Sequence, residues 1–145
     1  MAHLSRTVAS LRIGGDDLDP DEVSALLCCQ PTAGYRKGQV VRGPSSGRDF
    51  LKKTGSWMLD AEDQAPGDVD EQVRSILDRL PADLSIWRTL SSRYKIDLFC
   101  GWFMEETNEG IEVSANTLMR LGERAILLGV CIYAPLTEDY DEPKA

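Results

Sequence analysis

Alternating and continuous apolar runs predict four β-strands along the chain. Residues 7–13 alternate between apolar and polar positions, which is the period of a strand that buries one face. Residues 56–60 hold a short apolar run, and residues 95–104 alternate again. The last run, residues 125–133, is apolar at both odd and even positions, so we expect this strand to be well covered on both faces.

Four further segments have the start signals and apolar spacing of helices. Asp19 is followed by a proline and an acidic first turn, which is the pattern of a capped helix start. A second helix begins near Val69 and closes at Pro81, and a third follows over residues 82–92. Ser114 is in position to cap the fourth helix.

The order strand–helix–strand, two helices, strand–helix–strand predicts an α+β fold. We expect a mixed four-stranded sheet with helices packed on it, built from two βαβ-like halves as a variant of the ferredoxin-like sandwich. The inserted helical pair would either cover the second face of the sheet or extend the helical layer. Phe99, Phe103 and Tyr133 lie on a face that should otherwise be polar, and we expect the helical pair to cover them. A second subunit or a ligand is the alternative cover.

Composition and charge restrict the classes of function. The 145 residues suit a single domain over residues 1–136, with an acidic and disordered tail over residues 137–145. A net charge of -8 disfavours binding to nucleic acid and to anionic membranes. The sequence shows neither a membrane-spanning run nor a leader pattern, which favours a cytoplasmic protein. Its cysteines form no C-x-x-C pair, so we expect buried free thiols in a reducing compartment: Cys28, Cys29, Cys100 and Cys131.

Candidate catalytic and metal-binding residues are few. His3 is the single histidine and stands beside the chain start, so histidine-based catalytic and metal sites are disfavoured. The acid-rich residues 16–22 lack the glycine and glutamate positions of a calcium loop and favour helix capping instead. The glutamates at 105, 106, 109 and 112 favour exposed turn positions over an acid/base pair. We therefore predict no catalytic residue, no metal ligand and no cofactor.

A basic, glycine-rich segment interrupts the acidic chain. Residues 35–53 carry a charge of +5 on a chain of -8, which leaves -13 on the remainder. The segment is either an anion-binding or partner-binding arm, or a solvated loop whose charges offset the acidic body. We take four residues as candidate ligand-binding residues: Arg36, Lys37, Arg42 and Tyr133.

Several short motifs are spread along the chain: Leu11-Arg12-Ile13-Gly14, Leu18-Asp19-Pro20-Asp21-Glu22-Val23, Pro31-Thr32, Lys37-Gly38, Ser56-Trp57 and Ile132-Tyr133. In this order they resemble a bacterial family described as domain of unknown function 4279. The resemblance extends to about Pro135. It implies a small intracellular bacterial-type domain and transfers no catalytic residue, because the family has no agreed activity.

Two functions from different classes remain. The first is a non-enzymatic protein-interaction module, of an immunity or accessory type, for which an acidic surface would steer a basic partner. The alternative is a small anionic-ligand-binding or enzymatic domain, with a closed pocket between the sheet and the basic segment into which Arg36 or Lys37 points. A homodimer is compatible with either, since small sandwiches often bury a leftover apolar face symmetrically.

Overall fold

The computed structural model describes residues 2–136, so the predicted acidic tail lies outside the described residues. Its elements in chain order are β1 (Ala2–His3), β2 (Arg6–Gly15), α1 (Pro20–Leu27), β3 (Ala33–Tyr35), β4 (Val40–Arg42), β5 (Asp49–Leu51), β6 (Gly55–Asp60), α2 (Val69–Leu77), α3 (Leu84–Arg93), β7 (Lys95–Phe103), β8 (Glu109–Gly110), α4 (Ala115–Glu123) and β9 (Leu127–Tyr133). No helix in this part of the chain is long and apolar enough to cross a membrane.

The predicted α+β class with a mixed sheet is confirmed. The main sheet has five strands in the order β3-β6-β2-β7-β9, and all pairs are antiparallel except β7 with β9. The fifth strand, β3, was not among the four predicted strands. The unit β7-α4-β9 is a parallel βαβ crossover, whereas β6 returns antiparallel to β2 after α1. Two short pairs, β1 with β8 and β4 with β5, lie outside the main sheet.

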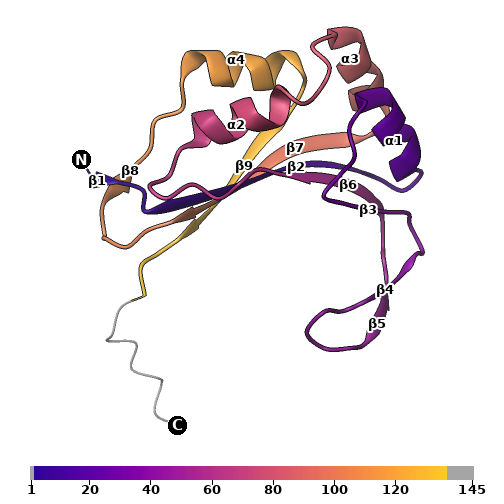
Figure 1. The fold of residues 1–145 in the computed structure, drawn as a ribbon, viewed down its shortest axis with the longest axis horizontal. Helices are drawn as coiled ribbons and strands as arrows, with labels where there is room; N and C mark the ends of the chain where they lie inside the picture. The colour runs from indigo at the N-terminus through magenta and orange to yellow at the C-terminus, as the bar shows by residue number, and fades with distance from the viewer. Residues whose placement is uncertain (1, 137–145) are drawn as a thin grey trace.

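All four helices lie on one face of the sheet (Figure 1). Their starts follow the predicted caps: the Asp19 side chain accepts a hydrogen bond from the N–H of Asp21, and Ser114 from that of Thr117. The helical pair α2 and α3 extends this layer, so the expectation that it covers the face of Phe99 is wrong. The reason is that this face also carries charged side chains, whose burial under an apolar helix face would be unfavourable.

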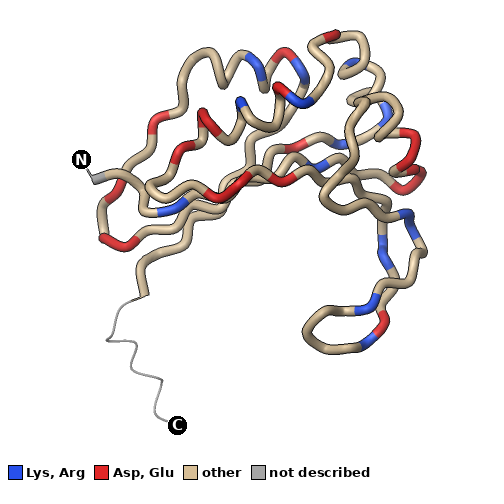
Figure 2. The backbone as a smooth tube through the Cα atoms, viewed as in Figure 1, with Lys and Arg blue, Asp and Glu red and all other residues tan. Residues whose placement is uncertain are grey.

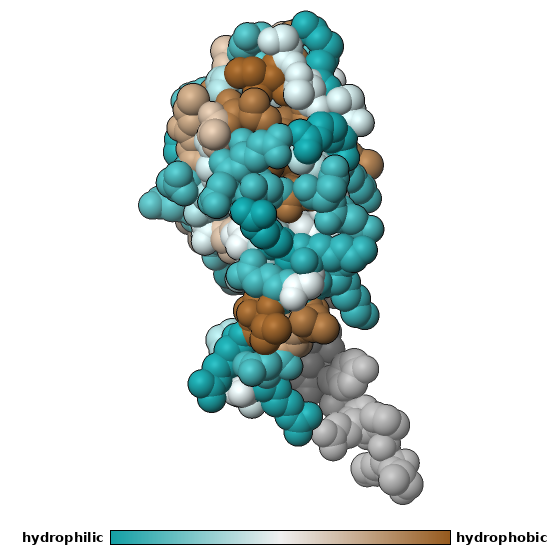
Figure 3. Space-filling model, turned by 90° about the vertical axis from the view of Figure 1, so that its right-hand side faces the viewer, coloured by the Kyte–Doolittle hydropathy of each residue, from teal (hydrophilic) through white to brown (hydrophobic). Residues whose placement is uncertain are grey.

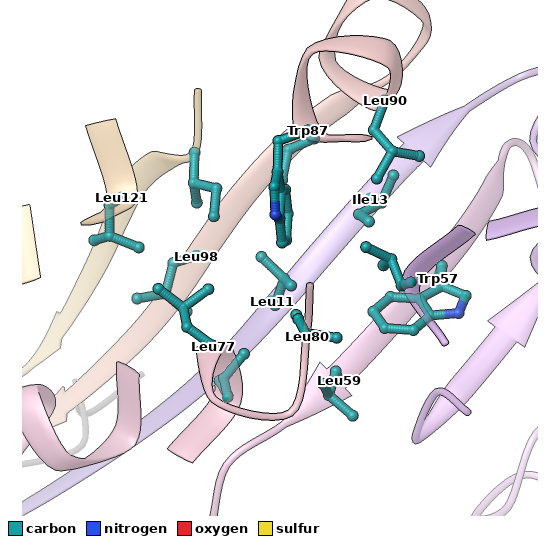
Figure 4. Close-up of a cluster of buried hydrophobic side chains, with 14 of the residues drawn as sticks. Leu11, Ile13, Trp57, Leu59, Leu77, Leu80, Trp87, Leu90, Leu98 and Leu121 are labelled. Atoms are coloured by element: carbon teal, nitrogen blue, oxygen red, sulfur yellow. The ribbon is translucent and has the colours of Figure 1, made fainter. Parts of the chain in front are cut away.

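The core lies between the helices and the sheet (Figure 4). Trp57 and Trp87 have no exposed surface, and each indole N–H is paired. Trp57 Nε1 donates to Ser24 Oγ at 3.0 Å, and Trp87 Nε1 donates to the Pro81 carbonyl at 2.9 Å. These two tryptophans are therefore core residues.

Strand β9 is not covered on both faces, and that expectation is wrong. It is the outermost strand of the sheet, and α4 covers only part of it. Leu127, Ile132 and Tyr133 are 53%, 61% and 43% exposed. An apolar run on both faces is the pattern of a central parallel strand, but here it belongs to an edge strand.

Candidate functional site

The basic, glycine-rich segment folds into a hairpin that projects from the sheet on the side opposite the helices (Figure 1). We call residues 36–54 the arm. The N–H of Gly38 donates to the carbonyl of Lys52 at 2.8 Å, which closes the hairpin at its base. Gly38 and Gly47 have φ angles of +83° and +64°, a left-handed conformation that glycine adopts without steric cost. The arm is therefore built by backbone pairing.

Two of the four candidate ligand-binding residues fasten the arm to the body. Arg36 Nη2 lies 2.8 Å from Oδ1 of Asp19 and 3.8 Å from Oδ2 of Asp21. Lys37 Nζ lies 3.3 Å from Oδ2 of Asp16. The side chains of Arg36 and Lys37 are 58% and 55% exposed, so water screens these pairs and each contributes less than about 1 kcal/mol. The acid-rich segment before α1 thus supplies the counter-charges for the base of the arm.

The other two candidates lie far from each other. Arg42 is exposed on β4 opposite Asp49, within the arm. Tyr133 ends β9 beside Phe103, whereas the arm leaves the sheet at the end of β7 that begins with Lys95. Eight residues of β7 separate these ends, which is about 26 Å at 3.3 Å per residue. The structure does not bring Tyr133 and the arm together, and the ligand-binding role of the four candidates stays a prediction.

The sheet face opposite the helices, which we call the open face, carries a stacked group at one end. The Arg6 guanidinium carbon lies 4.0 Å from the centroid of the Phe103 ring. Phe103 stacks on Tyr133 with ring centroids 4.5 Å apart and an angle of 11° between the ring planes. Arg6 Nη1 also lies 3.0 Å from Oδ2 of Asp63. Cation, rings and carboxylate therefore hold one another in place.

A second arginine repeats this arrangement nearer the arm. Arg12 lies over Phe99, with 4.8 Å from its guanidinium carbon to the ring centroid. Its Nε and Nη2 donate to the two carboxylate oxygens of Asp97, each at 2.8 Å. This hydrogen bonding and the Asp97 charge raise the pKa of Arg12 against the opposing effect of burial. Residues of this type, arginine and aromatic, are enriched where protein interfaces concentrate their binding energy.

Sequence reasoning missed Arg6 and Arg12 as functional candidates. Each stands at a polar position of an alternating strand, where a charged side chain is ordinarily solvated. Only the cross-strand register places Arg6 beside Phe103, and Arg12 next to Asp97 and two pairs away from Phe99, on the same face of the sheet. The signal was present only in the strand pairing.

A shallow hollow of about 350 Å³ lies where the open face meets the base of the arm. Backbone forms part of its floor because Gly14 has no side chain, and Arg12, Lys95 and Asp97 belong to its lining. A Cβ atom at Gly14 would approach only the carbonyl oxygen of Gly55, at 3.7 Å. Among residues 2–136, Lys95 has no ion-pair partner, so it is the cation of the hollow that is free to meet an anion.

The four cysteines are free, but only one of them is buried. Burial raises the pKa of the Cys100 thiol to about 11. Cys28 is exposed at the end of α1 with φ +50°, and Cys131 is exposed on β9. The expectation of buried thiols is therefore correct for Cys100 and wrong for Cys28 and Cys131, because one follows the last helical turn and the other lies on an edge strand.

One of the turn glutamates, Glu109, is held in place by hydrogen bonds. Glu109 Oε1 accepts hydrogen bonds from Ser5 Oγ at 2.6 Å and from the N–H of Glu105 at 3.1 Å. The bond from Ser5 above all lowers the pKa of Glu109, which is the opposite of what a general acid near neutral pH requires. The part of the chain that the structure describes contains no group of three or more His, Cys, Asp and Glu side chains arranged to hold a metal ion.

Comparison with known families gives one match. The family whose model matches is described as Domain of unknown function (DUF4279), and the match covers residues 5–135. No curated protein and no solved structure matches the chain. The matched region includes the whole main sheet, all four helices and the arm.

Proposed function

Because the chain belongs to the family described as Domain of unknown function (DUF4279), a description that assigns no activity, we propose its function from the geometry. The protein acts in the cytoplasm as a non-enzymatic interaction module, an accessory or immunity-type partner of another protein. It binds that partner through the open face and the arm. The observation that carries the proposal is the one-sided packing of the helices, which leaves the open face without a cover among residues 2–136.

The side chains of the open face are already ordered in the absence of a partner. Arg12 is held by two hydrogen bonds to Asp97 and by the Phe99 ring, so little side-chain entropy remains to be lost on association. Phe103 and Tyr133 form a stacked aromatic pair on the same face, at the end of the sheet away from the arm. Rigid aromatic and arginine side chains of this kind supply much of the binding energy in many interfaces.

The arm adds charge and apolar surface beside the open face. Among the described residues, four of its cations have no ion-pair partner: Arg42, Arg48, Lys52 and Lys53. They gather on the projecting hairpin (Figure 2), and an apolar band crosses the same hairpin at β4 and β5 (Figure 3). Val40, Phe50 and Leu51 are 60%, 46% and 63% exposed there. The complementary partner surface presents carboxylates next to apolar side chains.

The net negative charge of the chain favours a partner whose surface is basic outside the contact itself. The whole chain carries -8 although the arm is basic, so the remainder is strongly acidic. Such a field accelerates the approach of a basic partner and repels an acidic one at low salt. The expected partner is therefore a basic protein, such as one that itself binds nucleic acid. It carries a local acidic and apolar patch that meets the arm.

The test is comparative capture from native lysate with matched variants. Arg42→Glu reverses an exposed charge on the arm, and Arg88→Glu reverses an exposed charge on α3, so both change the net charge equally. Phe103→Ala removes a ring from the open face. We expect the unaltered protein and Arg88→Glu to retain the same stoichiometric partner, while Arg42→Glu and Phe103→Ala retain at least about 10-fold less.

The same experiment can reject the proposal. Capture of no stoichiometric protein, or equal capture by Arg42→Glu, Phe103→Ala and the unaltered chain, would show that this surface is not an interaction site. Circular dichroism of each variant ensures that a lost partner reflects the surface and not an unfolded chain.

A second function, binding of a small anion, is favoured by the hollow at the base of the arm. Its lining combines the free Lys95 with backbone at Gly14, where a ligand can approach closely. Gly14→Val fills this space without a backbone clash, and it should abolish binding of a small organic phosphate measured by calorimetry. Lys95→Met should weaken the same binding. Arg36 and Lys37 do not line the hollow, but Lys37 pairs with Asp16, which does. Arg36→Gln is therefore the control variant, and it should leave the affinity unchanged.

A further inference from the structure

The outer edge of β9 has none of the features that usually protect an edge strand. It pairs with no strand among residues 2–136, and its seven residues, Leu127–Tyr133, include no charged residue and no proline. Ile132 and Leu127 are more than half exposed. The free N–H and C=O groups of such an edge can pair with another strand. Soluble proteins ordinarily prevent this pairing with charged residues, prolines or bulges.

The free backbone groups of β9 can be assigned from its pairing with β7. The carbonyl of Tyr133 accepts a hydrogen bond from the N–H of Met104, at 3.1 Å, so Tyr133 directs its backbone groups toward β7. Backbone groups alternate in direction along a strand. Leu128, Val130 and Ile132 therefore direct their N–H and C=O groups away from the sheet.

We propose that β9 pairs antiparallel with β9 of a second copy of this chain, about a two-fold axis at Val130. In this register Val130 lies opposite the partner's Val130, and Leu128 lies opposite the partner's Ile132. The outward backbone groups of both strands then satisfy one another over the whole strand. The two five-stranded sheets become one continuous sheet.

The strand is self-complementary in side chains as well as in backbone. Opposite residues of an antiparallel pair share one face, so Leu127 lies beside the partner's Tyr133 on the open face. Every residue placed opposite another in this register is uncharged. Two chains that each carry -8 thus meet along a strip where no like charges oppose one another.

The apolar strip continues from β9 onto α4. Arg120 Nη2 lies 2.9 Å from Oδ1 of Asp78, so that side of α4 faces α2. Leu118, two residues earlier, is turned about 200° around the helix and faces away from α2, toward the free edge. Leu118 is 51% exposed and Val130 38%. With roughly 150–250 Å² per large side chain, Leu118, Leu127, Val130, Ile132 and Tyr133 together offer on the order of 450 Å² per copy.

That area is more than half of the roughly 800 Å² per partner of a standard protein interface, and the backbone of the strand adds to it. The pairing goes beyond the proposed function, because it leaves the arm and most of the open face free. It would place two copies of each on one rigid sheet, so a partner with two sites would bind with avidity. Dimerisation and partner capture can therefore fail independently.

The first test measures the mass of the full chain by analytical ultracentrifugation over a concentration series. Val130→Pro removes an outward N–H at the two-fold axis, and Val130→Thr keeps the same N–H and a similar shape. We expect the unaltered chain and Val130→Thr to be dimers and Val130→Pro to dimerise at least about 100-fold more weakly. A monomeric unaltered chain, an open-ended series of oligomers, or a dimer unaffected by Val130→Pro would overturn the proposal.

The second test does not depend on how well the proline variant folds. Cys28, Cys29 and Cys131 are first changed to serine, which leaves only the buried Cys100. In this background Val130→Cys places two thiols opposite each other across the axis, within disulfide reach. Leu127→Cys in the same background is the matched control, because its own copy lies about 20 Å away along the paired strands. Mild oxidation should give a covalent dimer with Val130→Cys only. Equal cross-linking of both variants, or of neither, would contradict the register.

Discussion

Gln72 connects α2 to β2 inside the core, and its substitution is the sharpest test of how the helices are held on the sheet. Its side chain is fully buried, and Gln72 Nε2 donates to the carbonyls of Thr7 and Glu62 at 2.9 and 3.0 Å. Gln72 Oε1 accepts from Thr7 Oγ1 at 2.9 Å, and Thr7 Oγ1 accepts from the N–H of Asp68 at 3.1 Å. The network joins α2 and the segment before it to the buried face of β2, so we expect its loss to be costly.

The magnitude follows from the bonds lost in Gln72→Met. Three hydrogen bonds at about 1 kcal/mol each disappear, and the buried Thr7 hydroxyl is left without an acceptor, while the methionine regains apolar contacts. We expect the free energy of unfolding to fall by about 2–4 kcal/mol, out of a usual total of about 5–15 kcal/mol. Thr7→Val should cost about 2 kcal/mol, since Gln72 and the N–H of Asp68 each lose a partner.

The double variant separates this network from simple loss of packing. Removal of both partners leaves fewer unpaired groups, so Thr7→Val with Gln72→Met should cost about 1–2 kcal/mol less than the two single costs added together. Urea unfolding followed by the fluorescence of the buried tryptophans measures all three variants. A cost below about 0.5 kcal/mol for Gln72→Met, or strictly additive costs, would refute the reasoning.

Three further predictions address packing, thiol reactivity and pH. Gly55→Ala should lower the free energy of unfolding by about 1–3 kcal/mol, because the new Cβ would lie 2.7 Å from a backbone oxygen; a urea midpoint equal to that of the unaltered chain would contradict this. Cys131 should react with a thiol reagent in the native protein, whereas Cys100 should react only on unfolding, since it is buried with a pKa of about 11; mass spectrometry of labelled peptides reads this out, and early labelling of Cys100 would count against its burial. Burial raises the pKa of Asp70, but hydrogen bonds, the first from the N–H of Ser114, outweigh it and leave the pKa lowered. The stability that Asp70 contributes is therefore present above its unfolded pKa of about 3.9 and is lost as the pH falls through the lower folded value, so Asp70→Asn should be less stable than the unaltered chain at neutral pH, with a gap that closes in acid; a constant gap would speak against it.

Local sequence patterns were sufficient to predict the four helices and the four longest strands among the described residues. Ser114 caps a helix where the sequence places it, and the alternation of residues 7–13 corresponds to a strand with one buried face. These features depend on backbone hydrogen bonding and on side-chain spacing within a few residues, so a single sequence contains them. The candidate site was harder to predict from the sequence. Arg36 and Lys37 were predicted as ligand-binding residues, and only the structure shows that Arg36 pairs with Asp19 and Lys37 with Asp16.

The sequence also does not show which segments become neighbours in space, and this explains the two wrong predictions about exposed surface. The apolar run of β9 predicts a strand, but it does not reveal that the strand is last in the sheet. Likewise, Phe99 and Phe103 were expected to lie beneath helices, and the structure places arginines over them instead. An aromatic residue on a polar face requires a partner, but the sequence does not say whether that partner is a helix or a cation.

The sequence by itself determined where the four described helices begin and which segments form the four longest described strands. These outcomes follow from local hydrogen bonding and from the removal of apolar side chains from water, which act on each segment separately. Only the tertiary structure decided that every described helix lies on one face, that β9 forms an edge, and that the basic segment is an arm fastened at its base. Those features arise from contacts between residues far apart in the chain, whose free energy depends on strand order and register.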